Sequence, residues 1–149
     1  MGFQTDATRY GQVSHAGGRF ATTGDAQGSL AVLRNSTTDS TTAELFLDGS
    51  TLRFTIANNS SVTYSILITG KSSDGQSAGY EFRGIIERAS FTTSMIGTPV
   101  KTVLGEDDAV WDAAVSADNA NGSLKIQVSG NTSDNIRWVA SIRTSEVTY

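Results

Sequence analysis

The sequence predicts an all-β protein, namely an antiparallel β-sandwich of jelly-roll type with about eight to nine strands and an extended N-terminal arm. Three observations favour this fold. Ser, Thr and Gly are abundant, while the good helix formers Leu, Glu, Lys and Gln are scarce. Apolar and polar residues alternate with a period of two in several segments. Turn-forming residues separate these segments at roughly the 8–12-residue spacing of a sandwich.

The first 29 residues predict an extended arm that precedes a sandwich domain of residues 30–149. This segment is rich in glycine, and its apolar residues occur singly. Fixing such a segment costs on the order of 1–2 kcal/mol of backbone entropy per residue, which so few apolar contacts do not offset within one subunit. We therefore expect another chain to order the arm.

The alternation becomes clear in the second third of the chain. Leu52, Phe54 and Ile56 alternate with polar residues, and the same pattern runs from Val62 to Ile68. It returns in segments 80–83, 111–115, 124–128 and 136–142. One face of each segment is therefore expected to be buried. The predicted core consists of Phe54, Ile56, Tyr64, Ile66, Tyr80, Phe82, Trp111, Val115, Ile126, Trp138 and Ile142.

Short polar segments supply the turns between these strands. Asp48-Gly49 separates two apolar segments and predicts a two-residue hairpin turn, in which both central residues take a positive φ. Segments 58–61, 72–77, 118–122 and 131–134 separate the later strands. The segment 106–111 is expected to be a loop that leads into a strand.

Composition argues against several classes of function. The formal net charge is −4 and charged residues make up 17% of the chain, which argues against nucleic-acid binding. No apolar run approaches the roughly 20 residues of a membrane-spanning helix, so we expect no membrane insertion. The absence of cysteine excludes disulfides and thiolate metal sites. No cofactor is expected.

No residue pattern predicts catalysis. His15 is the only histidine, and no Gly-x-Ser-x-Gly motif is present, so we expect His15 to be a loop residue. The segment 118–122 lacks the glutamate that closes a calcium loop and is interpreted as a turn. The acids available for glycoside hydrolysis sit where turns or solvated strand faces would place them. They are Glu81, Glu87, Glu106, Asp107, Asp108 and Asp112. We expect a non-enzymatic protein with no catalytic and no metal-binding residue.

The solvent-facing strand positions predict self-association. They carry little charge, and Leu67 and Val139 are apolar at positions that should face water. Phe3, Tyr10 and Phe20 are the corresponding candidates in the arm. These five residues are the candidate interface, and we expect a homo-oligomer, with a trimer favoured over a dimer.

An ordered series of segments resembles a β-rich domain of tail fibres and related virion appendages of tailed bacteriophages. The resemblance covers roughly residues 14–147. Its segments are 15–21, 24–27, 33–35, 37–39, 44–50, 78–84, 111–118 and 136–140. The family contributes no catalytic residue that can be transferred to this chain.

The resemblance implies a bacteriophage virion structural protein, assembled in the host cytoplasm, that serves host attachment or virion assembly. Its partners would be other virion proteins and a host surface glycan. In that family the domain is usually part of a longer polypeptide, so a free-standing copy could instead be an adaptor or a short appendage. Two alternatives remain open: a capsid decoration or head-fibre protein, and a carbohydrate-binding module of a glycan-active spike. A cleft with two acids and exposed aromatic residues would favour the last.

Overall fold

All regular secondary structure in the computed structural model, which describes residues 3–149, consists of β-strands. The all-β prediction is therefore confirmed. The strands are β1 (Val13–His15), β2 (Ala26–Thr37), β3 (Ala43–Glu44), β4 (Phe54–Thr55), β5 (Ser60–Ser72), β6 (Ser77–Ala89), β7 (Thr92–Met95), β8 (Val100–Glu106), β9 (Asp112–Asp118), β10 (Ser123–Ser129) and β11 (Ile136–Thr148).

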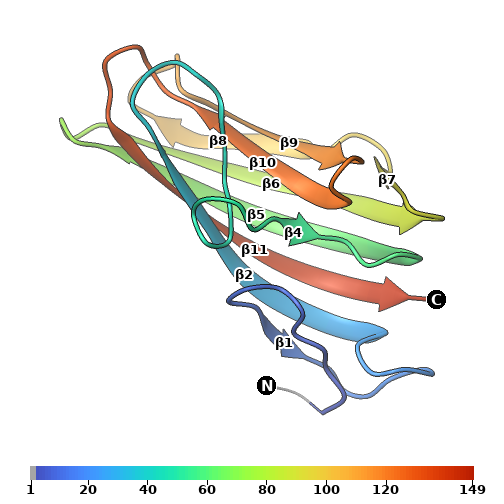
Figure 1. Cartoon of the computed structure of the whole chain (residues 1–149). Coiled ribbons are helices and arrows are strands. Elements are labelled where there is room, and N and C mark those ends of the chain that lie inside the picture. Colours follow the sequence, from blue (N-terminus) through green and yellow to red (C-terminus); the bar gives the residue numbers. More distant parts are fainter. Residues whose placement is uncertain (1–2) are drawn as a thin grey trace.

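The strands form two antiparallel sheets, as expected for a β-sandwich. The large sheet has the order β1-β2-β11-β5-β6-β7, and β8 pairs with β6 on the same edge as β7. In the small sheet, β9 pairs along one edge of β10, and the two short strands β3 and β4 pair with successive parts of its other edge. Figure 1 shows the long strands of the large sheet curving together, with β9 and β10 on the side of β6 and β7. β1 lies at the opposite edge of the large sheet.

The core lies between the two sheets and follows the predicted alternation. All the residues predicted for the core are buried except Val115, which is partly buried because β9 is an edge strand. Trp111 and Trp138 pack edge to face, with their ring centroids 5.5 Å apart. The Trp138 indole donates a hydrogen bond to the Thr37 hydroxyl at 3.0 Å, which satisfies its buried N–H.

The Asp48-Gly49 segment does not form the predicted two-residue hairpin. β3 and β4 pair with β10 and not with each other. The Asp48 carboxylate accepts hydrogen bonds from the backbone N–H groups of Ser50, Thr51 and Leu52, which widens the turn into a loop. Only Gly49 of the two central residues has a positive φ, of 82°. Capping by the aspartate therefore prevails over the hairpin preference.

The structure also contains short strands that the sequence pattern does not reveal, which is why it exceeds the expected eight to nine. β8 is the clearest case, because all seven of its residues are exposed and it pairs along one edge only, with β6. No helix in the described part of the chain is long and apolar enough to cross a membrane.

Candidate assembly surface

The outer face of the large sheet, which points away from the core, exposes both apolar residues that the sequence placed there. Leu67 on β5 is 51% exposed and Val139 on β11 is 46% exposed. Val139 pairs with Thr69, so Leu67, two residues before Thr69, is its diagonal neighbour. Diagonal neighbours in a sheet lie about 7–8 Å apart. The predicted pair therefore forms one continuous surface; its role as an interface stays a prediction.

Three more exposed apolar residues extend this surface across β2 and β1. Val32 on β2 is the diagonal neighbour of Val139 on its other side. Leu30 follows on the same face, and Val13 on β1 pairs with it directly. Sequence reasoning misses this extension because residues 30–33 are all apolar, so no alternation marks the exposed side. We call Val13, Leu30, Val32, Leu67 and Val139 the outer patch.

Five exposed basic side chains share this face with the outer patch. Strand pairing places them on the same side: Arg34 pairs with Val139, Arg143 with Leu30, and Lys71 with Arg137. We call this set the basic group. It consists of Arg34, Lys71, Arg83, Arg137 and Arg143.

Phe3, Tyr10 and Phe20 of the candidate interface are also exposed, but they do not belong to the outer patch. All three lie in the segment that precedes β2, whereas Leu67 and Val139 lie in the middle of the large sheet. The structure therefore separates the candidate residues into two groups. Their role as contacts with another chain stays a prediction.

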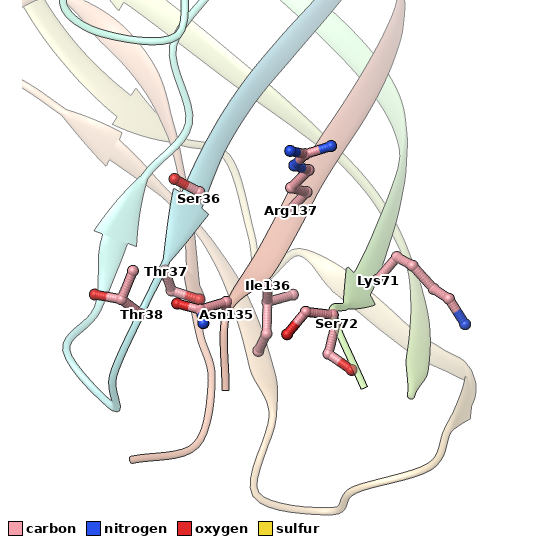
Figure 2. Close-up of a pocket in the computed structure, with 9 residues that line it drawn as sticks. Ser36, Thr37, Thr38, Lys71, Ser72, Asn135, Ile136 and Arg137 are labelled. Carbon is pink, nitrogen blue, oxygen red and sulfur yellow. The ribbon is translucent and has the colours of Figure 1, made fainter. Parts of the chain in front are cut away.

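The end of the large sheet where β2 and β5 end and β11 begins is hollowed into a cavity of about 500 Å³. Figure 2 shows its wall, which is built from the ends of β2 and β5 and the start of β11. The lining groups are hydroxyls and an amide, together with Lys71 and Arg137. Neither a carboxylate nor an aromatic ring lines it, so this cavity lacks the combination that would favour a glycan-cleaving site.

The candidate acids make separate contacts that stabilise loops and strand edges. Glu81 lies 3.2 Å from Arg83, and Asp112 pairs with Lys101. Asp107 accepts a hydrogen bond from the backbone of Ser77. Glu87 lies on β6, opposite Ser61.

Glu106 is the last residue of β8, and Asp108 lies in the loop between β8 and β9. The Tyr80 hydroxyl donates to Glu106 at 2.9 Å, and Asn131 donates to Asp108 at 2.9 Å. Burial, together with the nearby Glu106, raises the pKa of the Tyr80 phenol well above its ordinary value. Tyr80 is therefore a neutral hydrogen-bond donor at neutral pH.

His15 is not the loop residue that the sequence predicts, because it ends β1 and pairs with Gly28. Its side chain is exposed and lies near Arg143 in a shallow depression of about 360 Å³. None of the residues that line this depression carries a carboxylate that could orient the imidazole. Within residues 3–149, no group of three or more histidine, aspartate or glutamate side chains could hold a metal ion.

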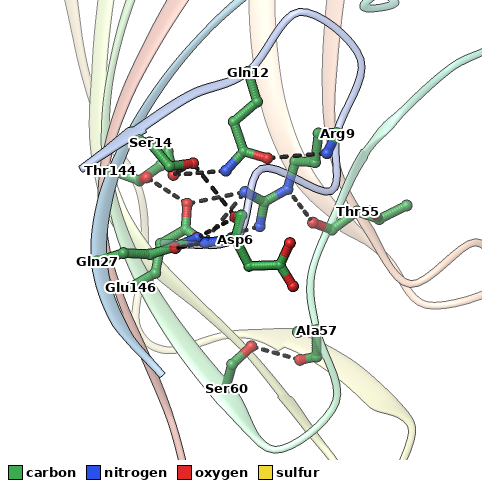
Figure 3. A network of polar contacts seen from close by, with 11 residues as sticks. Asp6, Arg9, Gln12, Ser14, Gln27, Thr55, Ala57, Ser60, Thr144 and Glu146 are labelled. Carbon is green, nitrogen blue, oxygen red and sulfur yellow. Dashed lines mark hydrogen bonds and ion pairs between the residues drawn. The ribbon is translucent and has the colours of Figure 1, made fainter. Parts of the chain in front are cut away.

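The N-terminal segment is anchored to its own chain by a buried polar network, which Figure 3 shows. The Arg9 guanidinium makes a bidentate contact with the Glu146 carboxylate, at 3.0 and 3.1 Å. Their side chains are only 5% and 8% exposed. Arg9 also donates to the Thr55 carbonyl at 2.7 Å and covers the Phe54 ring at 4.1 Å.

The expectation that another chain is needed to order this segment is therefore wrong for the residues from Arg9 onward. Apolar residues are few there, but a charged pair and the pairing of β1 with β2 supply the contacts. Sequence reasoning missed Arg9 because its partner, Glu146, lies 137 residues further along the chain. The division of the chain at residue 30 stays a prediction, although β2 already begins at Ala26.

No protein-family model and no curated protein matches this chain. Among solved structures, it is similar to the crystal structure of tailspike protein gp49 from Acinetobacter baumannii bacteriophage Fri1, a capsular polysaccharide depolymerase. The two chains are 14% identical, and the TM-score is 0.45. The match covers 81% of this chain and 18% of the tailspike chain. A likeness at this level supports no statement about function.

Proposed function

We propose that this protein is a non-enzymatic structural component of a tailed-bacteriophage particle, of the tail-fibre, spike or adaptor type, and that it assembles as a homotrimer through its outer patch. The outer patch is the observation that carries the proposal. The resemblance of residues 14–147 to virion appendage domains supplies the virion context. In this role the protein is a rigid β-module that serves host attachment or virion assembly.

The outer patch accounts for part of the free energy that assembly requires. Full burial of an exposed Val or Leu side chain contributes about 1.5–3 kcal/mol. Because the five patch residues are already about half buried, covering them would contribute about 4–7 kcal/mol per patch. Association costs about 4–15 kcal/mol in lost translational and rotational freedom. The patch therefore lies at the core of the contact, and polar contacts must add to it.

Sedimentation velocity on a Leu67→Glu variant tests the proposal. The glutamate places a charge in the middle of the patch, where its desolvation would oppose burial, so we expect the variant to sediment as a monomer. Leu52→Glu is the matched control, because Leu52 is also an exposed leucine but lies in the loop between β3 and β4. The control should sediment like the unmodified protein. Equal sedimentation of the Leu67→Glu variant and the unmodified protein would contradict the proposal.

A capsid decoration or head-fibre protein would differ from this proposal only in location. Electron microscopy of particles labelled with a gold-conjugated antibody against this protein separates the two. Label at the tail is expected, whereas label confined to the head would replace the tail assignment with the head assignment.

A further inference from the structure

The basic side chains of this protein gather on one face, where contacts within the chain leave much of their charge unpaired. Lys71 donates to the Gly75 carbonyl and the Ser77 hydroxyl, and Arg34 donates to the Asp48 carbonyl, so neither hydrogen bond involves a carboxylate. The basic group lies on the outer face of the large sheet, in a chain whose net charge is −4. On β2, β5, β6 and β11, the acids of this face are Glu81 and Glu87. Arg83 pairs with Glu81, whereas the described residues offer Arg137 and Arg143 no acid within 4 Å. The outer face therefore carries a surplus of positive charge.

Like charges also meet directly within the basic group. Arg137 on β11 and Lys71 on β5 are directly opposite each other in the sheet. Arg34 on β2 is the diagonal neighbour of Arg137 on the other side. Like charges placed opposite each other destabilise a sheet. A negatively charged partner on this face would relieve that repulsion.

Negative charge gathers instead at one end of the sandwich, where three loops meet. These are the β5–β6 loop (73–76), the β8–β9 loop (107–111) and the β10–β11 loop (130–135). Hydrogen bonds join them: the backbone of Ser73 donates to Asn135, and Asn131 donates to Asp108. The Trp111 indole donates to Asp134 at 3.1 Å.

We call the four carboxylates of these loops the acidic end. They are Asp74, Asp107, Asp108 and Asp134. Within residues 3–149, none of the four lies within 4 Å of a basic group. Their hydrogen-bond donors are neutral, such as the Ser77 backbone and Asn131. The acidic end therefore presents four carboxylates without an ion pair in the described chain; Lys71 reaches the same loop but donates to the Gly75 carbonyl.

We propose that the acidic end of one subunit docks on the basic group of a second copy of this chain. The contact is thus heterologous, because it joins two different surfaces. This inference rests on the proposed function, since it specifies the partner surface of the outer face in the assembly. The charge complementarity between the two surfaces carries it.

A face-to-face dimer is disfavoured by the same charges. In a two-fold contact, each patch meets an identical patch, so the basic group would oppose its own copy. A heterologous contact places opposite charges together, and it closes into a ring when the rotation between subunits allows it. A ring of three satisfies both the charge pattern and the expected trimer. The contact also adds the polar contribution that the outer patch alone lacks.

Two charge-reversed variants test the inference. The face variant carries Arg137→Glu and Arg143→Glu, and the end variant carries Asp74→Lys and Asp107→Lys; all four residues are exposed. In a heterologous contact, the face variant alone would place acidic residues on both contact surfaces, and the end variant alone would place basic residues on both. Each variant alone should therefore be monomeric by light scattering. A 1:1 mixture should associate beyond the monomer, because opposite charges meet wherever the two variants are neighbours. The two variants cannot alternate around a ring of three, so the expected product is a mixed species that contains both variants and not the native trimer. Arg19→Glu, a reversal in the N-terminal segment, is the control and should assemble like the unmodified protein.

The outcomes separate the inference from the proposed function. If the unmodified protein is an oligomer and the end variant assembles as well as it does, the acidic end is not the partner surface and the inference is wrong. A mixture that stays monomeric contradicts it too. Two neutral double variants control for misfolding, because they remove charge without reversing it: Arg137→Gln with Arg143→Gln, and Asp74→Asn with Asp107→Asn. Each should raise the dissociation constant of the assembly at least about tenfold. Added salt should cause a similar rise in the unmodified protein, because it screens the same charges. A monomeric unmodified protein would instead overturn the proposed function.

Discussion

Replacing Arg9 with methionine should destabilise the fold strongly at neutral pH. Methionine keeps much of the apolar contact with Phe54 but removes the bidentate partner of Glu146. The Glu146 side chain is only 8% exposed, so its carboxylate would be left charged, buried and without a basic partner. Removing one partner of a buried ion pair costs about 3–5 kcal/mol. That is a large share of the roughly 5–15 kcal/mol that stabilises a domain.

The pH dependence of this loss is specific to Glu146. Burial raises the pKa of the Glu146 carboxyl, but Arg9 and the hydrogen bonds outweigh it, so the pKa lies below the ordinary 4.5. Glu146 therefore stabilises the unmodified fold above about pH 4.5, and this contribution is lost as the pH falls through the lowered pKa. Without Arg9, burial remains and the pKa rises above 4.5. The loss of stability caused by the substitution should then be full above the raised pKa of the variant and should shrink as the pH falls from there towards the lowered pKa of the unmodified protein, because the unfolded-state pKa is common to both.

Urea unfolding at about pH 7 and pH 4 measures both effects. Arg137→Met is the matched control, because Arg137 is exposed and its side chain makes no hydrogen bond or ion pair with residues 3–149; it should change stability by less than about 0.5 kcal/mol. The double variant Arg9→Met, Glu146→Met should be more stable than Arg9→Met alone, since no buried charge remains. A loss below about 1 kcal/mol at pH 7, or a loss that grows on acidification, would refute the reasoning.

Two substitutions in the core and one activity assay give three further predictions. Trp138→Ala should cost about 3–5 kcal/mol in denaturant unfolding, because it leaves a cavity beside Trp111; a loss below 1 kcal/mol would contradict the packing. Gly70→Ala should cost about 1–3 kcal/mol in the same assay, because its Cβ would lie 2.4 Å from the Trp138 ring; unchanged stability would show that the ring can move aside. The protein should release no reducing sugar from host polysaccharide, and release that Glu81→Gln or Asp108→Asn abolishes would show that it is an enzyme.

Much of the sandwich could be predicted because burial and strand period coincide. Phe54, Tyr64 and Ile66 fall on the inward phase of their strands, and all three are buried. The same alternation predicts that Leu67 and Val139 face solvent, and both side chains are exposed in the structure. Where a strand has one buried face and one solvated face, the sequence therefore determines orientation.

The remaining features depend on contacts that local sequence does not record. β8 has no covered face, so its residues show no apolar alternation that corresponds to burial. The anchoring of Arg9 depends on Glu146, at the far end of the chain. Of the candidate assembly surface, the sequence reveals only Leu67 and Val139, because the basic group comes together across four strands and is scattered in the sequence.

The molar mass of the purified, unmodified protein, measured by light scattering at low salt, shows whether this chain assembles with itself. We expect a stable species of three times the 15.7 kDa chain mass, which dissociates as added salt screens the contact between the acidic end and the basic group. A stable monomer of 15.7 kDa across the accessible concentration range would contradict this expectation.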